Sequence, residues 1–296
     1  AKRWNRKNKS SSSRTAAALI VLGIIISSIS LKDGANIEVR REDGSTNSVG
    51  EMINEAVDKA GSYIMEQIDA ANVTGSGDYV GERSWNEVSA DNTYSVAADG
   101  VSSLNLAWIA GIVEIVPVSG DEIKISETCE NSLDDETALC WRVENGTLEI
   151  KYSARRDELP VKYLRIELPE TVEFEDVAVD MTTSSISAEG LTVKKLTVGS
   201  VSGNLIFRNC TVGTVVAETV SGEVQIGMRN ADAKLKINTV SGNVSLLVPE
   251  GTQPSVRFSS VSGDMVHSID CTVSENAAFS VDTVSGDLQI AAEKYE

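Results

Sequence analysis

A three-residue motif, Val-Ser-Gly, recurs five times in the last third of the chain and restricts its possible folds more than any other feature. The copies are Val201-Ser202-Gly203, Val220-Ser221-Gly222, Val240-Ser241-Gly242, Val261-Ser262-Gly263 and Val284-Ser285-Gly286, at intervals of 19, 20, 21 and 23 residues. A nearly constant period of about 20 residues is typical of a solenoid in which each repeat forms one coil. Because one coil cannot bury its apolar side alone, successive coils stack and share a continuous core.

Each coil is expected to hold two strands. One follows the glycine, as in Val244-Ser245-Leu246, and the other precedes the next motif, as in Val256-Arg257-Phe258. The glycine supplies the backbone freedom needed at a corner. A degenerate earlier copy lies at residues 184–187. We therefore predict an all-β, right-handed parallel β-solenoid with about 20 residues per coil, whose final coil is an incomplete cap.

A polar residue follows each motif glycine: Asn204, Glu223, Asn243, Asp264 and Asp287. Stacked oxygen atoms of this kind suit calcium, which makes a cation-binding ladder one interpretation. Two of the five residues are neutral, and the chain lacks the glycine-rich nonapeptide of calcium-binding solenoids. Solvated turn residues are therefore the interpretation that we favour.

Strand-like alternation begins upstream of the motifs, near Tyr94, and Asn145-Gly146 is a strong signal for a β-hairpin. The segments 104–115 (LNLAWIAGIVEI) and 120–125 (GDEIKI), followed by the Val-Ser-Gly coils, resemble the bacterial "putative adhesin" domain family. The resemblance covers roughly residues 94–296. It implies a membrane-anchored β-solenoid domain of unknown function and assigns no catalytic residue. We place this solenoid domain at 79–296.

The N-terminus predicts a membrane anchor. Residues 1–14 hold six basic side chains and no acidic one, and the next seventeen residues, 15–31, are uncharged. As a helix, this segment would span about 25 Å, which is close to what a bilayer needs. The basic residues favour a cytoplasmic tail, a single transmembrane helix and an extracytoplasmic body at the cell surface. A cleaved signal peptide is the main alternative, and a buried helix of a soluble domain is the other.

A linker at 32–78 is expected to contain an amphipathic helix at 49–71. Its apolar residues recur at steps of three and four, and Ser48 with Glu51 has the spacing of a capping box. This helix could pack on its own chain, pair with a second chain as a stalk, or lie on the membrane.

Composition excludes several classes of partner and site. The net charge is −18; removing the tail leaves 20 basic and 44 acidic side chains, a charge of −24. A body this acidic repels phosphate backbones, so nucleic acid is not an expected partner. The chain has four cysteines, one histidine and no Cys-x-x-Cys pair, which does not supply a zinc site. We expect neither a metal nor a cofactor.

The cysteines leave two possibilities open. Cys129 and Cys140 flank an acidic segment between two strand-like runs, where they could face each other across a hairpin as a disulfide. Two unpaired thiols are the alternative, since spacing does not establish geometry. Cys210 and Cys271 lie in apolar strand settings and are predicted to be core residues.

We expect a non-catalytic module that binds a protein, a cell-wall polymer or a glycan. A regulatory scaffold that senses the envelope through membrane partners is the alternative, and a polysaccharide-active β-helix enzyme is a remote one. The sequence contains neither Gly-x-Ser-x-Gly nor His-Glu-x-x-His, and the lone His267 has no partner motif. Unpaired strand edges at the last coil could also support self-association.

Overall fold

The computed structural model describes residues 38–40, 46–48, 79–80, 85–130, 132–155 and 159–294. The chain forms two compact units, Ala1–Asp69 and Ala70–Glu296. In the first unit, strand β1 (Glu38–Arg40) pairs antiparallel with β2 (Thr46–Ser48).

The predicted basic tail 1–14, membrane helix 15–31 and amphipathic helix 49–71 lie outside the described residues. Within the described part of the chain, no helix is long and apolar enough to cross a membrane.

The second unit consists almost entirely of strands joined by turns. They are β3 (Tyr79–Val80), β4 (Thr93–Ala97), β5 (Ser103–Val118), β6 (Glu122–Cys129), β7 (Cys140–Glu144), β8 (Thr147–Lys151), β9 (Ala154–Arg155), β10 (Lys162–Pro169), β11 (Glu173–Glu189), β12 (Thr192–Ser202), β13 (Leu205–Ser221), β14 (Val224–Met228), β15 (Lys234–Ser241), β16 (Val244–Pro249), β17 (Ser255–Ser260), β18 (Met265–His267), β19 (Thr272–Val273), β20 (Phe279–Ser285) and β21 (Leu288–Glu293). Most alternate buried apolar residues with exposed ones, as strands with one face in a core do.

The central coils stack in parallel at the period of the sequence repeat. Glu173 of β11 faces Thr192 of β12, which faces Thr211 of β13, a step of 19 residues each time. Between β13 and β15 the step is 20 residues, with Thr214 facing Lys234. The expectation of stacked parallel coils of about 20 residues is met. The right-handed sense of the coil stays a prediction.

Each coil contributes to two sheets that meet at the Val-Ser-Gly corner. Face A consists of β8, residues 103–110 of β5, 173–183 of β11, β12, residues 211–221 of β13, β15, β20 and β17. Face B consists of β10, residues 111–118 of β5, 184–189 of β11, 205–209 of β13, β14, β16, β21 and β18. The two sheets enclose one continuous apolar core.

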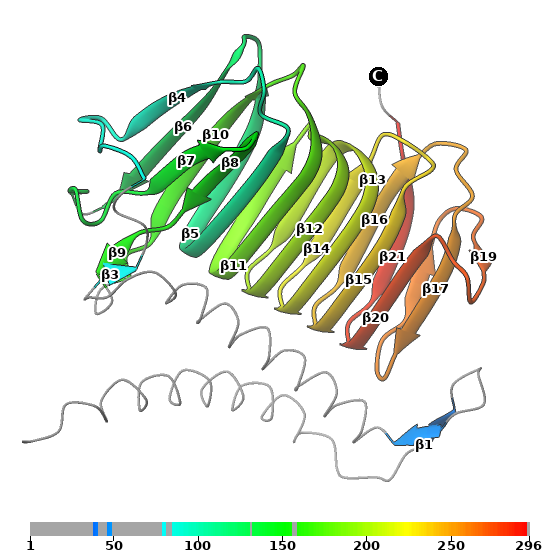
Figure 1. Cartoon of the computed structure of the whole chain (residues 1–296). Coiled ribbons are helices and arrows are strands. Elements are labelled where there is room, and N and C mark those ends of the chain that lie inside the picture. The colour runs from blue at the N-terminus through cyan, green and yellow to red at the C-terminus, as the bar shows by residue number, and fades with distance from the viewer. Residues whose placement is uncertain are drawn as a thin grey trace, which may run out of the picture. The chain divides into compact units, whose positions relative to one another are not determined.

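At the C-terminal end, the coils do not stack in the order of the sequence. Strands β20 and β21 lie between β15 and β16 on one side and β17 and β18 on the other, and they pair in parallel with all four. Figure 1 shows the red strand β20 between β15 and the orange β17. The expectation that the last coil caps the stack is therefore wrong. Residues 250–254 carry the chain past one coil position in the stack. Strand β19 and residues 274–278 carry it back, so that β20 and β21 occupy that position.

The N-terminal end has the same exchange. Strands β8 and β10 follow β5 in the sequence, yet both pair in parallel with the outer side of β5, while β11 pairs with its inner side. Antiparallel strands then close this end, with β7 on β8, β6 on β10 and β4 on β6. The predicted hairpin is confirmed, because Glu144 of β7 faces Thr147 of β8 across Asn145-Gly146.

Candidate functional site

The Val-Ser-Gly motifs form the corner between the two faces. Gly222 has a φ of +123°, and a Cβ atom placed on it would lie 2.1 Å from the carbonyl oxygen of Gly203 in the neighbouring coil. The same contact links Gly203 to Ser184, so the predicted degenerate copy at residues 184–187 lies at the corner, with Ser184 at the position of the motif glycine. The motif serines bond along the stack: Ser221 Oγ donates to the carbonyl of Val201 at 3.5 Å. These motifs are structural.

The polar residue after each glycine also bonds between coils. The Asn204 side chain accepts the backbone N–H of Glu223 at 3.0 Å, and the Asn243 side chain accepts that of Asp287 at 3.0 Å. Asp287 in turn accepts the N–H of Asp264 at 2.9 Å. These oxygens stabilise the stack. Across the described residues, no group of three His, Cys, Asp or Glu side chains is arranged to hold a metal ion.

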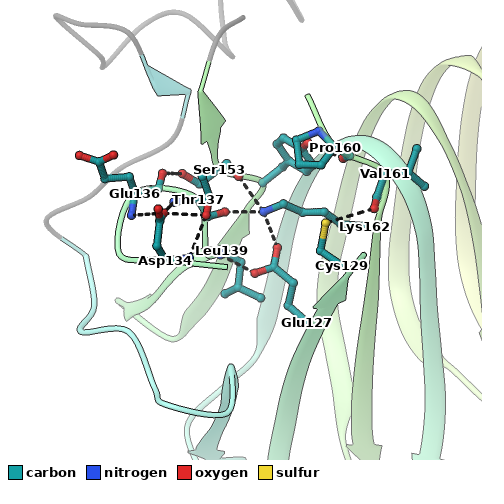
Figure 2. Close-up of polar contacts among 11 residues, drawn as sticks. Glu127, Cys129, Asp134, Glu136, Thr137, Leu139, Ser153, Pro160, Val161 and Lys162 are labelled. Atoms are coloured by element: carbon teal, nitrogen blue, oxygen red, sulfur yellow. Dashed lines mark hydrogen bonds and ion pairs between the residues drawn. The ribbon is translucent and has the colours of Figure 1, made fainter. Parts of the chain in front are cut away.

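A buried ion pair joins the antiparallel cap to the solenoid, and nothing in the sequence pattern pointed to it. The Lys162 and Glu127 side chains are both fully buried, with Nζ 2.7 Å from Oε1. The ammonium group also donates to the carbonyls of Thr137 and Ser153, as Figure 2 shows. The second carboxylate oxygen of Glu127 accepts the N–H of Leu139 at 2.7 Å. Each charged group thus has internal partners.

Tyr152 closes this cluster on one side. Its ring lies 4.6 Å from Lys162 Nζ, and its hydroxyl donates to the carbonyl of Pro160 at 2.7 Å. Burial raises the pKa of Tyr152 well above its usual value, and the neighbouring Cys129 and Glu127 add to the effect. A neutral tyrosine and a fully bonded ion pair, both shielded from solvent, fix the loop 132–139 to the end of the stack. Their geometry suits a structural lock.

The cysteines are free thiols in the structure. Cys129 and Cys140 do not face each other across a hairpin, because β6 pairs with β4 and β10 while β7 pairs with β8. The predicted disulfide across a hairpin is therefore wrong, and both residues are thiols in the structure. Cys210 is fully buried, as predicted, and burial raises its pKa to about 11.

A shallow pocket of about 510 Å³ lies at the C-terminal end, lined by residues 251–253 and 267–270. His267 is exposed there, and its Nδ1 lies 2.7 Å from the carbonyl oxygen of Ile269. This contact is local to the turn. No acidic partner orients the ring within the described residues, so the arrangement does not resemble an acid–base pair.

The outer surface of face B offers the most extended candidate site. One in-register row crosses six coils without a charge and consists of Ser187, Ile206, Gln225, Ser245, Gln289 and Val266, here called the uncharged strip. At about 4.8 Å per strand, it is about 24 Å long. All six side chains are exposed or half-buried, and Val266 is 60% exposed.

Charged side chains border the strip at its N-terminal end. Glu114, which faces Ser187, accepts hydrogen bonds from Tyr163 and Arg165, and Arg165 also bonds Glu167 at 3.2 Å. The hydrogen bond to Glu114 raises the pKa of the Tyr163 hydroxyl, so this phenol stays a donor at neutral pH. The sequence reasoning missed the strip, because its residues lie about 20 positions apart and only the stacking register aligns them.

One family model matches part of the solenoid. Residues 166–291 match the family model described as Toastrack DUF4097. No curated protein matches the chain.

Three solved structures of similar proteins have low sequence identity to the chain. A "putative cell adhesion protein" from Clostridium sporogenes is 15% identical, covers 68% of this chain and 98% of its own, and has a TM-score of 0.46. A "putative adhesin" from Bacteroides fragilis is 13% identical over 68% of this chain and 96% of its own, with a TM-score of 0.33. A "putative lipid binding protein" from Parabacteroides distasonis is 14% identical over 69% and 96%, with a TM-score of 0.32. The residues that match the Toastrack DUF4097 family model, 166–291, run from β10 to β21.

Proposed function

We propose that the chain is a non-catalytic, membrane-anchored binding module that presents a right-handed β-solenoid outside the cell. The observation that carries the proposal is the uncharged strip of face B, which gives an extended partner a continuous row of neutral side chains. Interface cores are depleted of charged residues, because burying an unpaired charge is costly. The match of residues 166–291 to the Toastrack DUF4097 family model supports the solenoid assignment.

The interior supports a binding role over catalysis. Lys162 and Glu127, the buried acidic and basic side chains of the described residues, bond each other and the backbone around them. The stacked coils repeat near-equivalent positions, which suits an extended ligand such as a glycan strand or an extended segment of protein. The membrane anchor rests on the uncharged segment 15–31 and the basic residues before it.

Two substitutions on the strip test the proposal. Full-length protein carrying Ile206→Glu and Ser245→Glu is compared with the wild type for saturable co-sedimentation with purified cell envelope. The expected result is at least about a tenfold loss of affinity, since two carboxylates would be desolvated in the contact. Thr147→Glu with Asn105→Glu on face A is the matched control, because it adds the same charge away from the strip.

Several outcomes would overturn the proposal. Equal binding by the strip variant and the wild type would remove the strip from the contact. Absence of saturable binding, or release of reducing ends from envelope polymer by the wild type, would contradict a non-catalytic binding module. External protease on intact cells tests the topology, and a C-terminal tag that stays intact would contradict an extracytoplasmic body.

A further inference from the structure

The outward side chains of face A change sign across four neighbouring strands. Strand β11 presents Glu173, Glu175, Asp176 and Asp180, and β12 presents Lys194 and Lys195. Strand β13 presents mainly small neutral residues, Thr211, Gly213, Thr214 and Val216, with the exposed Glu218 beyond them, and β15 presents Lys234 and Lys236. One edge of this four-strand patch is therefore acidic and the opposite edge is basic.

Two ion pairs within the chain link the acidic strand β11 to β12. Lys194 lies 2.6 Å from Glu175, and Lys195 lies 3.7 Å from Asp176. At the two edges, Glu173 of β11 and both lysines of β15 have no ion-pair partner among the described residues. Unpaired acidic and basic side chains therefore remain on opposite sides of one flat surface.

The register makes this pattern self-complementary. Asp176, Lys195, Thr214 and Lys234 form one row at the same height along the strands. A twofold axis parallel to the strands, between β12 and β13, would place β11 of one copy over β15 of the other. In that arrangement Asp176 lies opposite Lys234 of a second copy, and β13 lies opposite β12.

The centre of the patch allows two sheets to approach closely. Gly213, Thr214 and Val216 are short, and stacked sheets pack about 10 Å apart when their facing side chains are of this size. Four strands of about eight residues give an area of about 500 Å² per copy, or about 1,000 Å² buried in total. That area is at the lower limit of specific interfaces and fits a weak dimer. Anchoring in one membrane would raise the effective concentration of the copies.

We propose that this patch of face A binds a second copy of the same chain, with the acidic β11 of each copy against the basic β15 of the other. Each contact is made twice, as twofold symmetry requires. The dimer leaves face B, with its uncharged strip, facing outward on both sides. The inference stands apart from the proposed function, because dimerisation needs no envelope ligand.

Charge reversal tests the dimer on the full-length chain in nonionic detergent at about 0.15 M salt, by sedimentation velocity over a range of concentrations. The wild type is expected to show a concentration-dependent monomer–dimer equilibrium. Lys234→Glu with Lys236→Glu makes both edges acidic and is expected to weaken the dimer at least about tenfold. Glu173→Lys with Glu175→Lys removes the net negative charge of β11 and is expected to do the same.

Mixing the two double variants gives the decisive result. Each variant weakens its own contact, but in a mixed pair the basic β15 of one copy meets the acidic β11 of the other, while the acidic β15 meets the neutralised β11. The mixture is therefore expected to form heterodimers. Lys124→Glu with Lys294→Glu changes the net charge equally, lies outside the patch and should leave the dimer unchanged. A wild type that stays monomeric up to about 100 µM, a dimer unaffected by Lys234→Glu with Lys236→Glu, or a mixture that does not associate would overturn the proposal.

Discussion

Each corner glycine of the Val-Ser-Gly motif lies against the backbone of the coil beside it, where a side chain has no room. Gly222→Ala is therefore expected to cost about 3–5 kcal/mol, because the new methyl group would overlap the Gly203 carbonyl as well as strain φ. Gly251→Ala is the matched control, since Gly251 also has a positive φ, +85°, but open space around its Cβ position. It should cost only about 1–2 kcal/mol. Urea unfolding measures both, and equal costs would contradict the tight corner.

The Lys162–Glu127 pair gives a second prediction at this scale. Lys162→Met leaves the Glu127 carboxylate buried without its cation and should lower the unfolding free energy by about 3–5 kcal/mol. Lys162→Met with Glu127→Leu removes both charges and should recover most of that loss. Lys194→Met breaks an exposed pair and should change stability by less than about 1 kcal/mol. Thermal or urea unfolding of the three variants measures these differences. A Lys162→Met variant as stable as the wild type would contradict the structural role of the ion pair.

The buried thiol of Cys210 makes stability depend on alkaline pH. Because burial raises its folded pKa to about 11, the unfolded chain loses this proton at a lower pH than the folded chain. The contribution is complete below the unfolded pKa and is lost as the pH rises toward 11. Between about pH 9 and 11 the wild type should lose about 2–3 kcal/mol more stability than Cys210→Ala. If the unfolding free energies of the two proteins fell equally between these pH values, a buried neutral thiol at Cys210 would be excluded.

At the scale of strands, β20 and β21 hold the end coil in place. Strands β17 and β18 pair with them and not with β15 and β16. Removing residues 274–296 should therefore leave 255–267 without its main partners, so that its amides exchange rapidly with solvent. Residues 85–249 should remain protected. Hydrogen exchange with mass spectrometry makes this measurement, and continued protection of 255–267 would show that it restacks directly on β15 and β16.

The strands and coils were predictable because their signals are local. The apolar alternation of 147–151, the Asn145-Gly146 turn and the period of about 20 residues each specify a structure within one or two coils. The exchange of coils was not predicted, although the longer intervals of 21 and 23 residues mark it. Any Val-Ser-Gly coil can stack on any other, so the period does not determine the order.

The Lys162–Glu127 pair was missed for a related reason. These residues are 35 positions apart, and only the antiparallel pairing of β6 with β10 brings them together. The disulfide geometry failed because Cys129 and Cys140 are close in the sequence but lie on strands that do not pair. The uncharged strip likewise appears only once the register is known. Contacts that depend on which strand lies beside which cannot be derived from one sequence.

For the molecule as a whole, the coils near both ends of the stack are out of sequence order. Strands β20 and β21 thereby lie between two coils, and the exposed end consists of the short β18 and β19 together with residues 257–260 of β17. Short edge strands limit edge-to-edge association, so self-association is expected on face A and not at this edge. The interior is packed and its buried charges are paired, which leaves the outer faces for partners.

Cysteine cross-linking tests the exchanged order most directly. Lys236 faces Ser280, and Ser280 faces Arg257, so Lys236 and Arg257 lie two strands apart, at about 10 Å. Disulfides require Cα atoms within about 7 Å. Full-length Lys236→Cys with Ser280→Cys should therefore cross-link on mild oxidation, with the linked peptides identified by mass spectrometry, and Lys236→Cys with Arg257→Cys should not. Stacking in sequence order would bring Lys236 beside Arg257 and give the opposite pair of results.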